Sequence, residues 1–220
     1  MDTFSASDRR KVTKDWQVLF PDLGIYRPMH LLNRLGPILV GIALETDRGS
    51  SYYKPSFHVH NLCRQFPVVT LTLQADWGKG IVKPFYHEKK HKEYADAMLE
   101  KVRISFSGDV TLEKVLKAYE EYFKKPDISQ YVEFEDYALL CGWSGDASKI
   151  KHALKVVHSY LKNWPEERYF RDEGGFNNWF TSLEKRVMDR KTLIETVEKQ
   201  IIELKVDKLP ARSLLINGHS

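Results

Sequence analysis

The 220 residues and 42% hydrophobic content suffice for one large globular domain, or a smaller one with a helical appendage, and exclude extensive disorder. Basic residues (34) only slightly outnumber acidic ones (30) and both are spread along the chain, so the net charge of +4 is weak support for nucleic-acid binding. We expect a soluble, cytoplasmic protein without membrane contact, because no apolar run reaches about 18 residues, no secretory signal is visible, and Cys63 and Cys141 give no disulfide framework.

The first part of the chain is predicted to pass from helices to strands. Apolar residues recur at helical spacing between Ser7 and Phe20, and a second, short helix is predicted over 28–35. Because successive strands with short connections usually pair with their neighbours in the chain, the next segments predict an antiparallel meander. These segments of strand length are 38–44, 52–62 and 67–74.

The remainder of the chain is predicted to be mainly helical. Helices are expected over about 87–102 and 112–123, followed by a fourth strand over 131–141, where apolar and polar residues alternate. Asp146 is the expected N-cap of a further helix, and a charged loop is expected over 165–175. The predicted fold class is therefore α+β, with an antiparallel sheet of four or more strands covered by helices.

A long amphipathic helix is predicted over 176–206. With Phe180 at heptad position a, apolar residues occupy positions a and d, except at Arg190. The helix is predicted to pack on another protein or a second copy through this seam, or alternatively on its own domain, because further apolar residues widen the face. The seam residues predicted to bind a partner are Phe180, Leu183, Val187, Ile194, Val197, Ile201 and Leu204.

Three parts are thus predicted along the chain: a globular α+β domain over 1–175, the amphipathic helix over 176–206, and a flexible tail over 207–220. At 1.5 Å per residue, roughly 28 residues of this helix would be about 42 Å long, more than a small domain covers along its whole length. The seam therefore favours a role in assembly with another protein.

The segment from His87 to His91, His-Glu-Lys-Lys-His, has the spacing of a zinc peptidase motif. On a helix His87 and His91 would share one face and bind Zn²⁺, while Glu88 would activate the metal-bound water as general base. Against this interpretation, Pro84 lies only three residues before His87, two lysines separate Glu88 from His91, and no third ligand stands in a recognisable motif. The alternative is a pair of capping or packed histidines on an amphipathic helix.

His58 and His60 form a second candidate metal site. Residues two apart on a strand point to the same face of the sheet, about 6.6 Å apart. The pair could therefore bind a metal ion, alone or together with His87 and His91. The alternative is an ordinary polar face of the sheet.

Two nucleic-acid hypotheses concern the segment 76–92. Asp76, Glu88 and Lys90 match the loose pattern of a Mg²⁺-dependent nuclease, in which two carboxylates hold the metal and a lysine stabilises the developing charge. Lysines interleaved with aromatic residues also favour contacts to phosphates and bases, although a solvated helix face is the alternative. The candidate phosphate-binding residues are Lys79, Lys83, Lys89, Lys90 and Lys92.

Glu133, Glu135 and Asp136 are predicted to lie on the wet face of the fourth strand, where they could meet a basic partner. Three hypotheses for function result. The favoured one is a non-catalytic interaction subunit or inhibitor in a larger intracellular assembly, with no cofactor. The alternatives are a metal-dependent hydrolase, either a peptidase or a nuclease, that uses zinc or magnesium at the clustered histidines, and a nucleic-acid-binding component.

Overall fold

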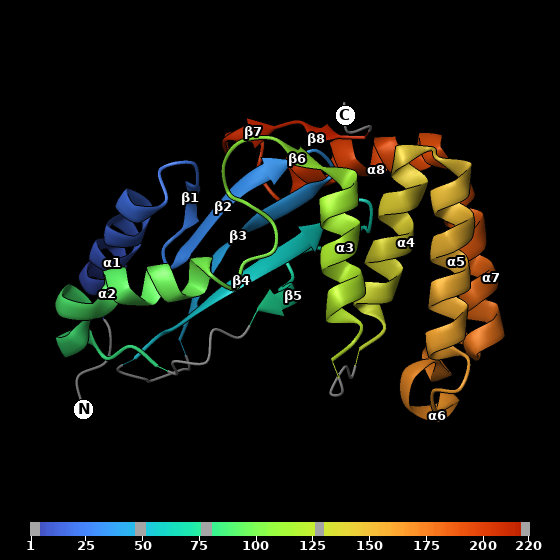
Figure 1. Ribbon diagram of the computed structural model, residues 1–220, viewed down its shortest axis with the longest axis horizontal. Helices are drawn as coiled ribbons and strands as arrows, with labels where there is room; N and C mark the ends of the chain where they lie inside the picture. The colour runs from blue at the N-terminus through green and yellow to red at the C-terminus, as the bar shows by residue number, and fades with distance from the viewer. Residues whose placement is uncertain (1–4, 47–51, 76–80, 126–129, 217–220) are drawn as a thin grey trace. The chain divides into compact units, whose positions relative to one another are not determined.

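A computed structural model describes residues 5–46, 52–75, 81–125 and 130–216 (Figure 1). The chain divides into two compact units. Unit 1 comprises residues 1–60, 70–115 and 206–220, and unit 2 comprises residues 61–69 and 116–205. The predicted α+β class is confirmed. None of the helices described is long and apolar enough to cross a membrane.

Unit 1 is built on the predicted antiparallel meander, whose strands pair in chain order. These strands are β1 (Gly24–Arg27), β2 (His30–Leu35), β3 (Ile38–Glu45), β4 (Lys54–Asn61) and β5 (Thr72–Ala75). A short strand, β7 (Ala211–Arg212), adds to β2 in parallel, and β6 (Val110–Thr111) pairs with β8 (Leu214–Leu215). Residues 211–215, which lie within the expected flexible tail, are therefore held by strand pairing.

The prediction of a short helix over 28–35 is wrong, because this segment contains β2. Two-residue connections bracket the strand: Pro28 and Met29 before it, and Gly36 and Pro37 after it. Met29 (φ 67°) and Gly36 (φ 54°) both have left-handed backbone conformations, which reverse the chain. The central sequence Leu-Leu suited a helix equally well, because a strand buried on both faces shows no alternation.

Two helices of unit 1 pack against each other, α1 (Ala6–Leu19) and α2 (Pro84–Leu99). A capping box fixes the start of α1, since the Ser5 side chain accepts from the Asp8 amide and the Asp8 carboxylate accepts from the Ser5 amide. Trp16 of α1 is completely buried and stacks on Phe20. The first predicted helix is thereby confirmed, and the helix predicted over 87–102 exists with a start three residues earlier.

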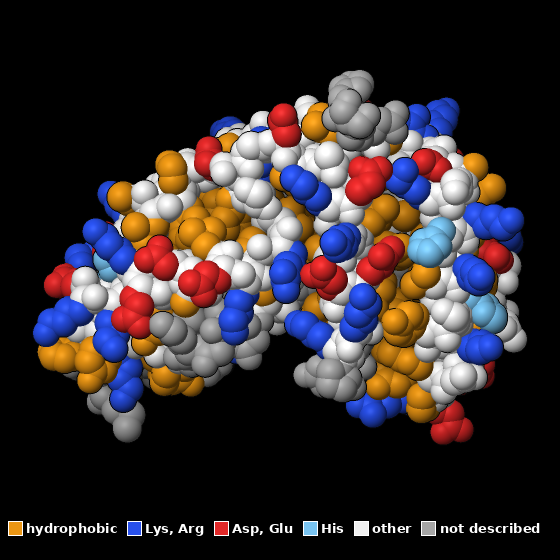
Figure 2. Space-filling view, viewed as in Figure 1, with side chains coloured by type: hydrophobic (Ala, Val, Ile, Leu, Met, Phe, Trp, Pro, Cys, Tyr) orange, Lys and Arg blue, Asp and Glu red, His pale blue; other side chains and the backbone are white. Residues whose placement is uncertain are grey.

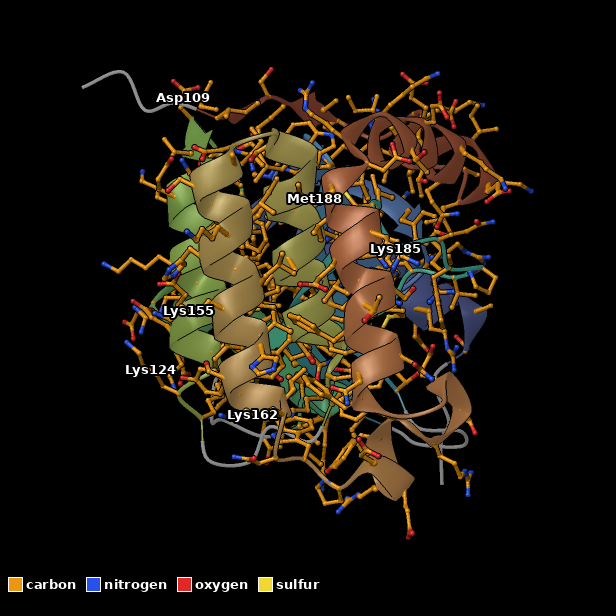
Figure 3. The ribbon with its side chains drawn as sticks, turned by 90° about the vertical axis from the view of Figure 1, so that its right-hand side faces the viewer. Asp109, Lys124, Lys155, Lys162, Lys185 and Met188 are labelled. Carbon is orange, nitrogen blue, oxygen red and sulfur yellow. The ribbon has the colours of Figure 1, made fainter. Side chains whose placement is uncertain are left out.

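Unit 2 is helical, and α4 (Val132–Ser144) lies at its centre, in contact with α5 (Ala147–Leu161), α7 (Phe176–Met188) and α8 (Arg190–Glu203) (Figure 3). The prediction of a fourth strand over 131–141 is wrong, because this segment lies almost entirely in α4. Nearly every residue of α4 is buried, so the helix has no polar face and hence no helical period in its sequence.

Other helices of unit 2 follow the prediction more closely. The predicted helix over 112–123 is α3 (Leu112–Tyr122), which begins in unit 1 and continues in unit 2. Asp146 caps α5 as expected, since its carboxylate accepts from the backbone amides of Ser148 and Lys149. The expected loop over 165–175 contains the short helices α6 (Glu166–Tyr169) and η1 (Arg171–Glu173).

The long C-terminal helix is present as α8, of 14 residues. The rest of the range predicted for it forms a separate helix, α7, and the chain leaves the helical conformation at Asp189 (φ −96°, ψ 72°). Asp189 also caps α8, because its side chain accepts from the Thr192 amide. The polar interruption of the heptad pattern at Arg190 marks this division.

Candidate functional site

His87 of the predicted zinc motif belongs to a chain of buried hydrogen bonds in unit 1. The Trp16 indole donates to the Tyr53 hydroxyl (3.0 Å), which lies 2.7 Å from Nδ1 of His87. Nε2 of His87 lies 3.0 Å from Oδ2 of Asp15. Because the indole can only donate and the carboxylate accepts, His87 donates from Nε2 and accepts at Nδ1.

This hydrogen-bonding pattern leaves His87 without a ring nitrogen for a metal ion. Burial also lowers the pKa of His87, although the Asp15 carboxylate opposes the shift, and the ring is therefore neutral near pH 7. The other motif residues are engaged locally: Nδ1 of His91 donates to the His87 carbonyl (2.8 Å), and Glu88 pairs with Lys11 (2.7 Å). His87 and Glu88 thus connect α2 to Asp15 and Lys11 of α1. The four-residue spacing of the two histidines reflects neighbouring turns of one helix.

The second histidine pair is buried in the sheet of unit 1. His58 and His60 are both 0% exposed, which differs from the expected polar face. Nε2 of His58 lies 2.7 Å from Nε2 of His30, so one ring donates to the other and the accepting ring is neutral. Burial lowers the pKa of His30 to about 4 and holds the pKa of His58 well below its ordinary range. Nδ1 of His60 accepts from the Thr70 amide.

The candidate metal ligands are not gathered into one site. Among the residues that the structure describes, no three His, Cys, Asp or Glu side chains are arranged to hold a metal ion. Asp76, the first residue of the nuclease pattern, and Lys79 lie outside the described residues. The remaining candidate lysines, Lys83, Lys89, Lys90 and Lys92, are exposed.

The predicted partner-binding seam lies largely inside unit 2. Four seam residues are at most 8% exposed: Leu183 and Val187 of α7, Val197 of α8, and Leu204, the C-cap of α8. Both helices contact α4. The other seam residues, Phe180, Ile194 and Ile201, are half-buried. The apolar seam therefore holds unit 2 together, while Met188 and Ile202, outside the seam, are more than 70% exposed.

The polar side of the same two helices lines a groove of about 610 Å³, which we take as the candidate functional site. Residues 63–66 and the start of α4 form the rest of its lining. On the surface of the groove lie Phe66, which is 38% exposed, and the exposed Lys185 of α7. Figure 3 shows Lys185 and Met188 on α7.

Two contacts between an arginine and an acidic side chain fix the base of the groove. Nε of Arg64 lies 3.0 Å from Oδ1 of Asp136, and both side chains are at most 10% exposed. Arg186 of α7 pairs with Glu135 of α4, and the Arg64 guanidinium lies 5.1 Å from the centre of the Phe66 ring. These contacts join α4, α7 and the segment 63–66, whose Phe66 amide also donates to Gln200 of α8 (3.0 Å). The groove is therefore formed before any partner binds.

Burial strongly changes the titration of two acidic groups of α4 and of Cys63. It raises the pKa of Asp136 to about 7, although the neighbouring Arg64 guanidinium opposes the shift. It also raises the pKa of Glu133, and holds the pKa of the Cys63 thiol well above its ordinary range. Cys63 is therefore a thiol and a poor nucleophile near pH 7.

Sequence reasoning identified the acidic cluster but placed it on a strand, and missed its basic partners. Arg64 and Arg186 stand 72 and 51 residues from the carboxylates that they pair with. No local signal joins residues so far apart. The available signal was the density of Glu and Asp within an otherwise apolar segment, because buried acids require cations.

Comparisons with protein-family models, curated proteins and solved structures give no match for this chain. The candidate site is therefore interpreted from its own chemistry.

Proposed function

We propose that this protein is a non-catalytic interaction component of a larger cytoplasmic assembly, and that the groove of unit 2 receives an extended, acidic segment of a partner protein. The observation that supports the proposal most directly is a preformed groove of about 610 Å³ that presents Phe66 and Lys185 to solvent. An exposed aromatic ring beside a cation matches an apolar residue next to an acidic one.

The charges that line the groove favour an acidic partner. The Glu135 carboxylate is paired with Arg186, and the Asp189 carboxylate accepts from the amide and hydroxyl of Thr192 at 3.0 and 2.7 Å. The Glu135 charge is offset by Arg186, whereas the exposed Asp189 carboxylate keeps its charge and is oriented toward Thr192. The ammonium group of Lys185 is the cation that an acidic residue of a partner would meet at the surface, and complementary charge would set the orientation of the bound segment.

The side chains of the groove that could take part in catalysis are buried, which favours binding over catalysis. Cys63 is 4% exposed and Asp136 is 0% exposed, so both lie beneath the groove surface. Asp136 is held by Arg64, and the raised pKa of Cys63 keeps the thiol protonated. These residues support the groove, and a substrate seated in it would meet Phe66 and Lys185 first.

Photocrosslinking in the native host tests the proposal. A benzophenone amino acid placed at Lys185 or Thr192, both on the groove, should give a product of the same mass with one partner protein. The matched controls are Lys191 and Glu198, which are exposed on α8 but do not line the groove. A second copy of this chain as the captured protein would place a homo-oligomer interface here.

The captured segment then provides a direct measurement. A synthetic peptide of that segment should bind the purified protein, and changing its acidic residues to amides, or Lys185 to Glu, should weaken binding roughly fivefold or more. Products of equal yield from groove and control positions, or binding that is indifferent to both charge changes, would refute the proposal.

A second candidate function, contact with single-stranded nucleic acid, is favoured by the first turns of α2. Phe85 is 73% exposed and Tyr86 is 45% exposed. The ammonium groups of Lys89 and Lys90 lie 5.3 and 5.9 Å from the centres of these two rings. Exposed rings beside lysines can stack on bases while the charges meet phosphates.

Fluorescence anisotropy with a labelled single-stranded oligonucleotide tests this candidate. Binding should weaken steeply between about 50 and about 200 mM salt, because phosphate contacts release counterions. The double change Lys89→Glu and Lys90→Glu should abolish binding, whereas the same charge change at Lys151 and Lys155 of α5 should have little effect. Equal effects of the two double changes would remove the assignment to α2.

A further inference from the structure

A second concave surface, independent of the groove, lies on unit 1. It is a hollow of about 510 Å³ between the end of α1, the end of α2 and the segment that leads to β6 and α3. Figure 2 shows hydrophobic side chains gathered there, with polar side chains around them. The volume lies within the range of about 300–1,000 Å³ that is usual for small-molecule sites.

The floor of the hollow is aromatic. Phe20 and Phe106 meet edge to face, with ring centres 5.4 Å apart. Beneath them, Phe20 stacks on Trp16 and Phe106 contacts Phe57 (5.8 Å), so both rings rest on the core of unit 1. Leu99, at the end of α2, lines the hollow and is 48% exposed. An apolar ring seated here would cover Leu99 and pack on the edges of the two phenylalanines, which are themselves only 4% and 5% exposed.

Side chains from elsewhere in unit 1 hold the walls. The guanidinium of Arg212 donates to the carbonyls of Gly108 (2.6 Å) and Ser105 (2.8 Å). The buried Asn33 amide donates to the Phe106 carbonyl (3.0 Å), and its second contact, to the Asp22 carbonyl, is 3.4 Å. Both sides of the hollow are therefore fixed without a ligand, which lowers the entropic cost of binding.

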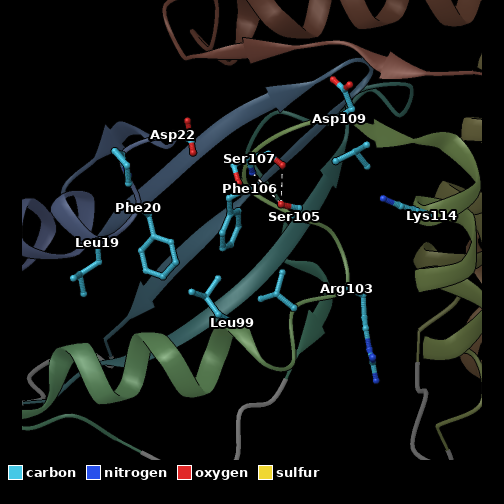
Figure 4. Close-up of a pocket in the computed structure, with 13 residues that line it drawn as sticks. Leu19, Phe20, Asp22, Leu99, Arg103, Ser105, Phe106, Ser107, Asp109 and Lys114 are labelled. Atoms are coloured by element: carbon cyan, nitrogen blue, oxygen red, sulfur yellow. Dashed lines mark hydrogen bonds between the residues drawn. The ribbon is translucent and has the colours of Figure 1, made fainter. Parts of the chain in front are cut away.

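The charged residues around the hollow point in different directions (Figure 4). The ammonium group of Lys114 extends toward the centre, whereas the side chains of Arg103 and Asp109 extend away from it. The carboxylate of Asp22 interacts electrostatically with Arg212. The charge directed at a bound molecule is thus the cation of Lys114, and Ser107 also lines the hollow.

We propose that this hollow binds a small amphipathic anion, an aromatic carboxylate or a molecule of that class. The apolar ring lies on Phe20 and Phe106, and the carboxylate meets the Lys114 ammonium. This assignment concerns unit 1 alone and does not depend on the interaction proposed for unit 2.

Titration of the full-length protein with 3-phenylpropionate, followed in methyl NMR spectra, tests the assignment. The methyl signals of Leu99, Val102 and Val110, which line the hollow, should shift together and saturate. The neutral analogue 3-phenylpropanamide should bind roughly fivefold more weakly, because it lacks the charge that faces the ammonium. Lys114→Met should remove this preference and leave weak binding of both compounds.

Lys117→Met is the matched control, since Lys117 is exposed on the same helix but does not line the hollow. This variant should keep the preference for the carboxylate. No saturating shift at these methyl groups with either compound would overturn the site. Equal affinity for carboxylate and amide in the unaltered protein, or a preference that survives Lys114→Met, would overturn the assignment of an anion.

Discussion

Stability of unit 2 should fall as the pH rises through neutrality, because Asp136 is buried. Its carboxyl group has an ordinary pKa of 3.8, and burial raises this pKa to about 7 in the folded protein. Between these values the folded state holds a proton that the unfolded state has released. The free energy of unfolding therefore decreases with pH across this interval. The stabilisation is fully present below about pH 4 and is lost as the pH passes about 7.

The size of the effect comes from the same two values. Each tenfold change in proton affinity is worth about 1.4 kcal/mol, so the interval from 3.8 to about 7 corresponds to about 4 kcal/mol. Asp136→Asn removes the titrating group and keeps an acceptor near Arg64. Relative to the unaltered protein, the variant should gain about 3 kcal/mol between pH 4.5 and pH 8.5, because part of the interval lies below pH 4.5.

Urea unfolding followed by tryptophan fluorescence measures this difference at each pH. Asp172→Asn is the control, since that side chain is 92% exposed. Its unfolding free energy should run parallel to that of the unaltered protein. A constant difference for Asp136→Asn would refute the reasoning. A loss that grows with pH would show that pairing with Arg64 outweighs desolvation and that the carboxylate is ionised.

Three further predictions concern packing and hydrogen bonds, each read from thermal and urea unfolding. Leu183→Ala should lower the free energy of unfolding by about 2–5 kcal/mol, because the side chain is fully buried. Ile202→Ala, at a position 72% exposed, should lower it by less than about 0.5 kcal/mol. Similar losses in the two variants would mean that the seam does not hold unit 2 together. Tyr53→Phe should cost about 1–3 kcal/mol by removing the group that joins Trp16 to His87, and an unchanged stability would contradict the hydrogen-bond chain. Gly142→Ala should cost about 1–3 kcal/mol, since an added Cβ would lie 2.5 Å from the Val187 carbonyl oxygen, and a neutral effect would contradict the close approach of α4 and α7.

Local patterns predicted the fold where one side of an element faces solvent. Helix α1 has Val12 and Trp16 buried while most of its other residues are exposed or half-buried, and its apolar period is visible in the sequence. β3 is an exception, since it is buried on both faces, and it was predicted because its apolar run has the length of a strand and is followed by turn residues. The misassigned elements, β2 and α4, are buried on all sides. Their secondary structure is decided by packing, which the local pattern does not record.

The candidate site was less accessible to prediction than the fold. His87 and His91 have the spacing of metal ligands because a helix places every fourth residue on one face, and that geometry also serves a hydrogen bond to Tyr53. The groove depends on pairs such as Arg64 with Asp136, which are distant in sequence. A pattern within one element indicates which side chains are neighbours on that element, and gives no information about what faces them.

The ion pairs of unit 2 explain why an acidic helix start is tolerated in a buried position. Glu133 and Glu135 lie in the first turn of α4, where the helix dipole favours negative charge, yet burial still makes their desolvation costly. Arg64 and Arg186 offset part of this cost only if residues 63–66 and α7 keep fixed positions against α4. Loss of either cation would leave a buried acid uncompensated, so the charges disfavour other arrangements of these elements more than they stabilise this one. A groove shaped in this way keeps its form when empty, which is what selective recognition of a short charged segment requires.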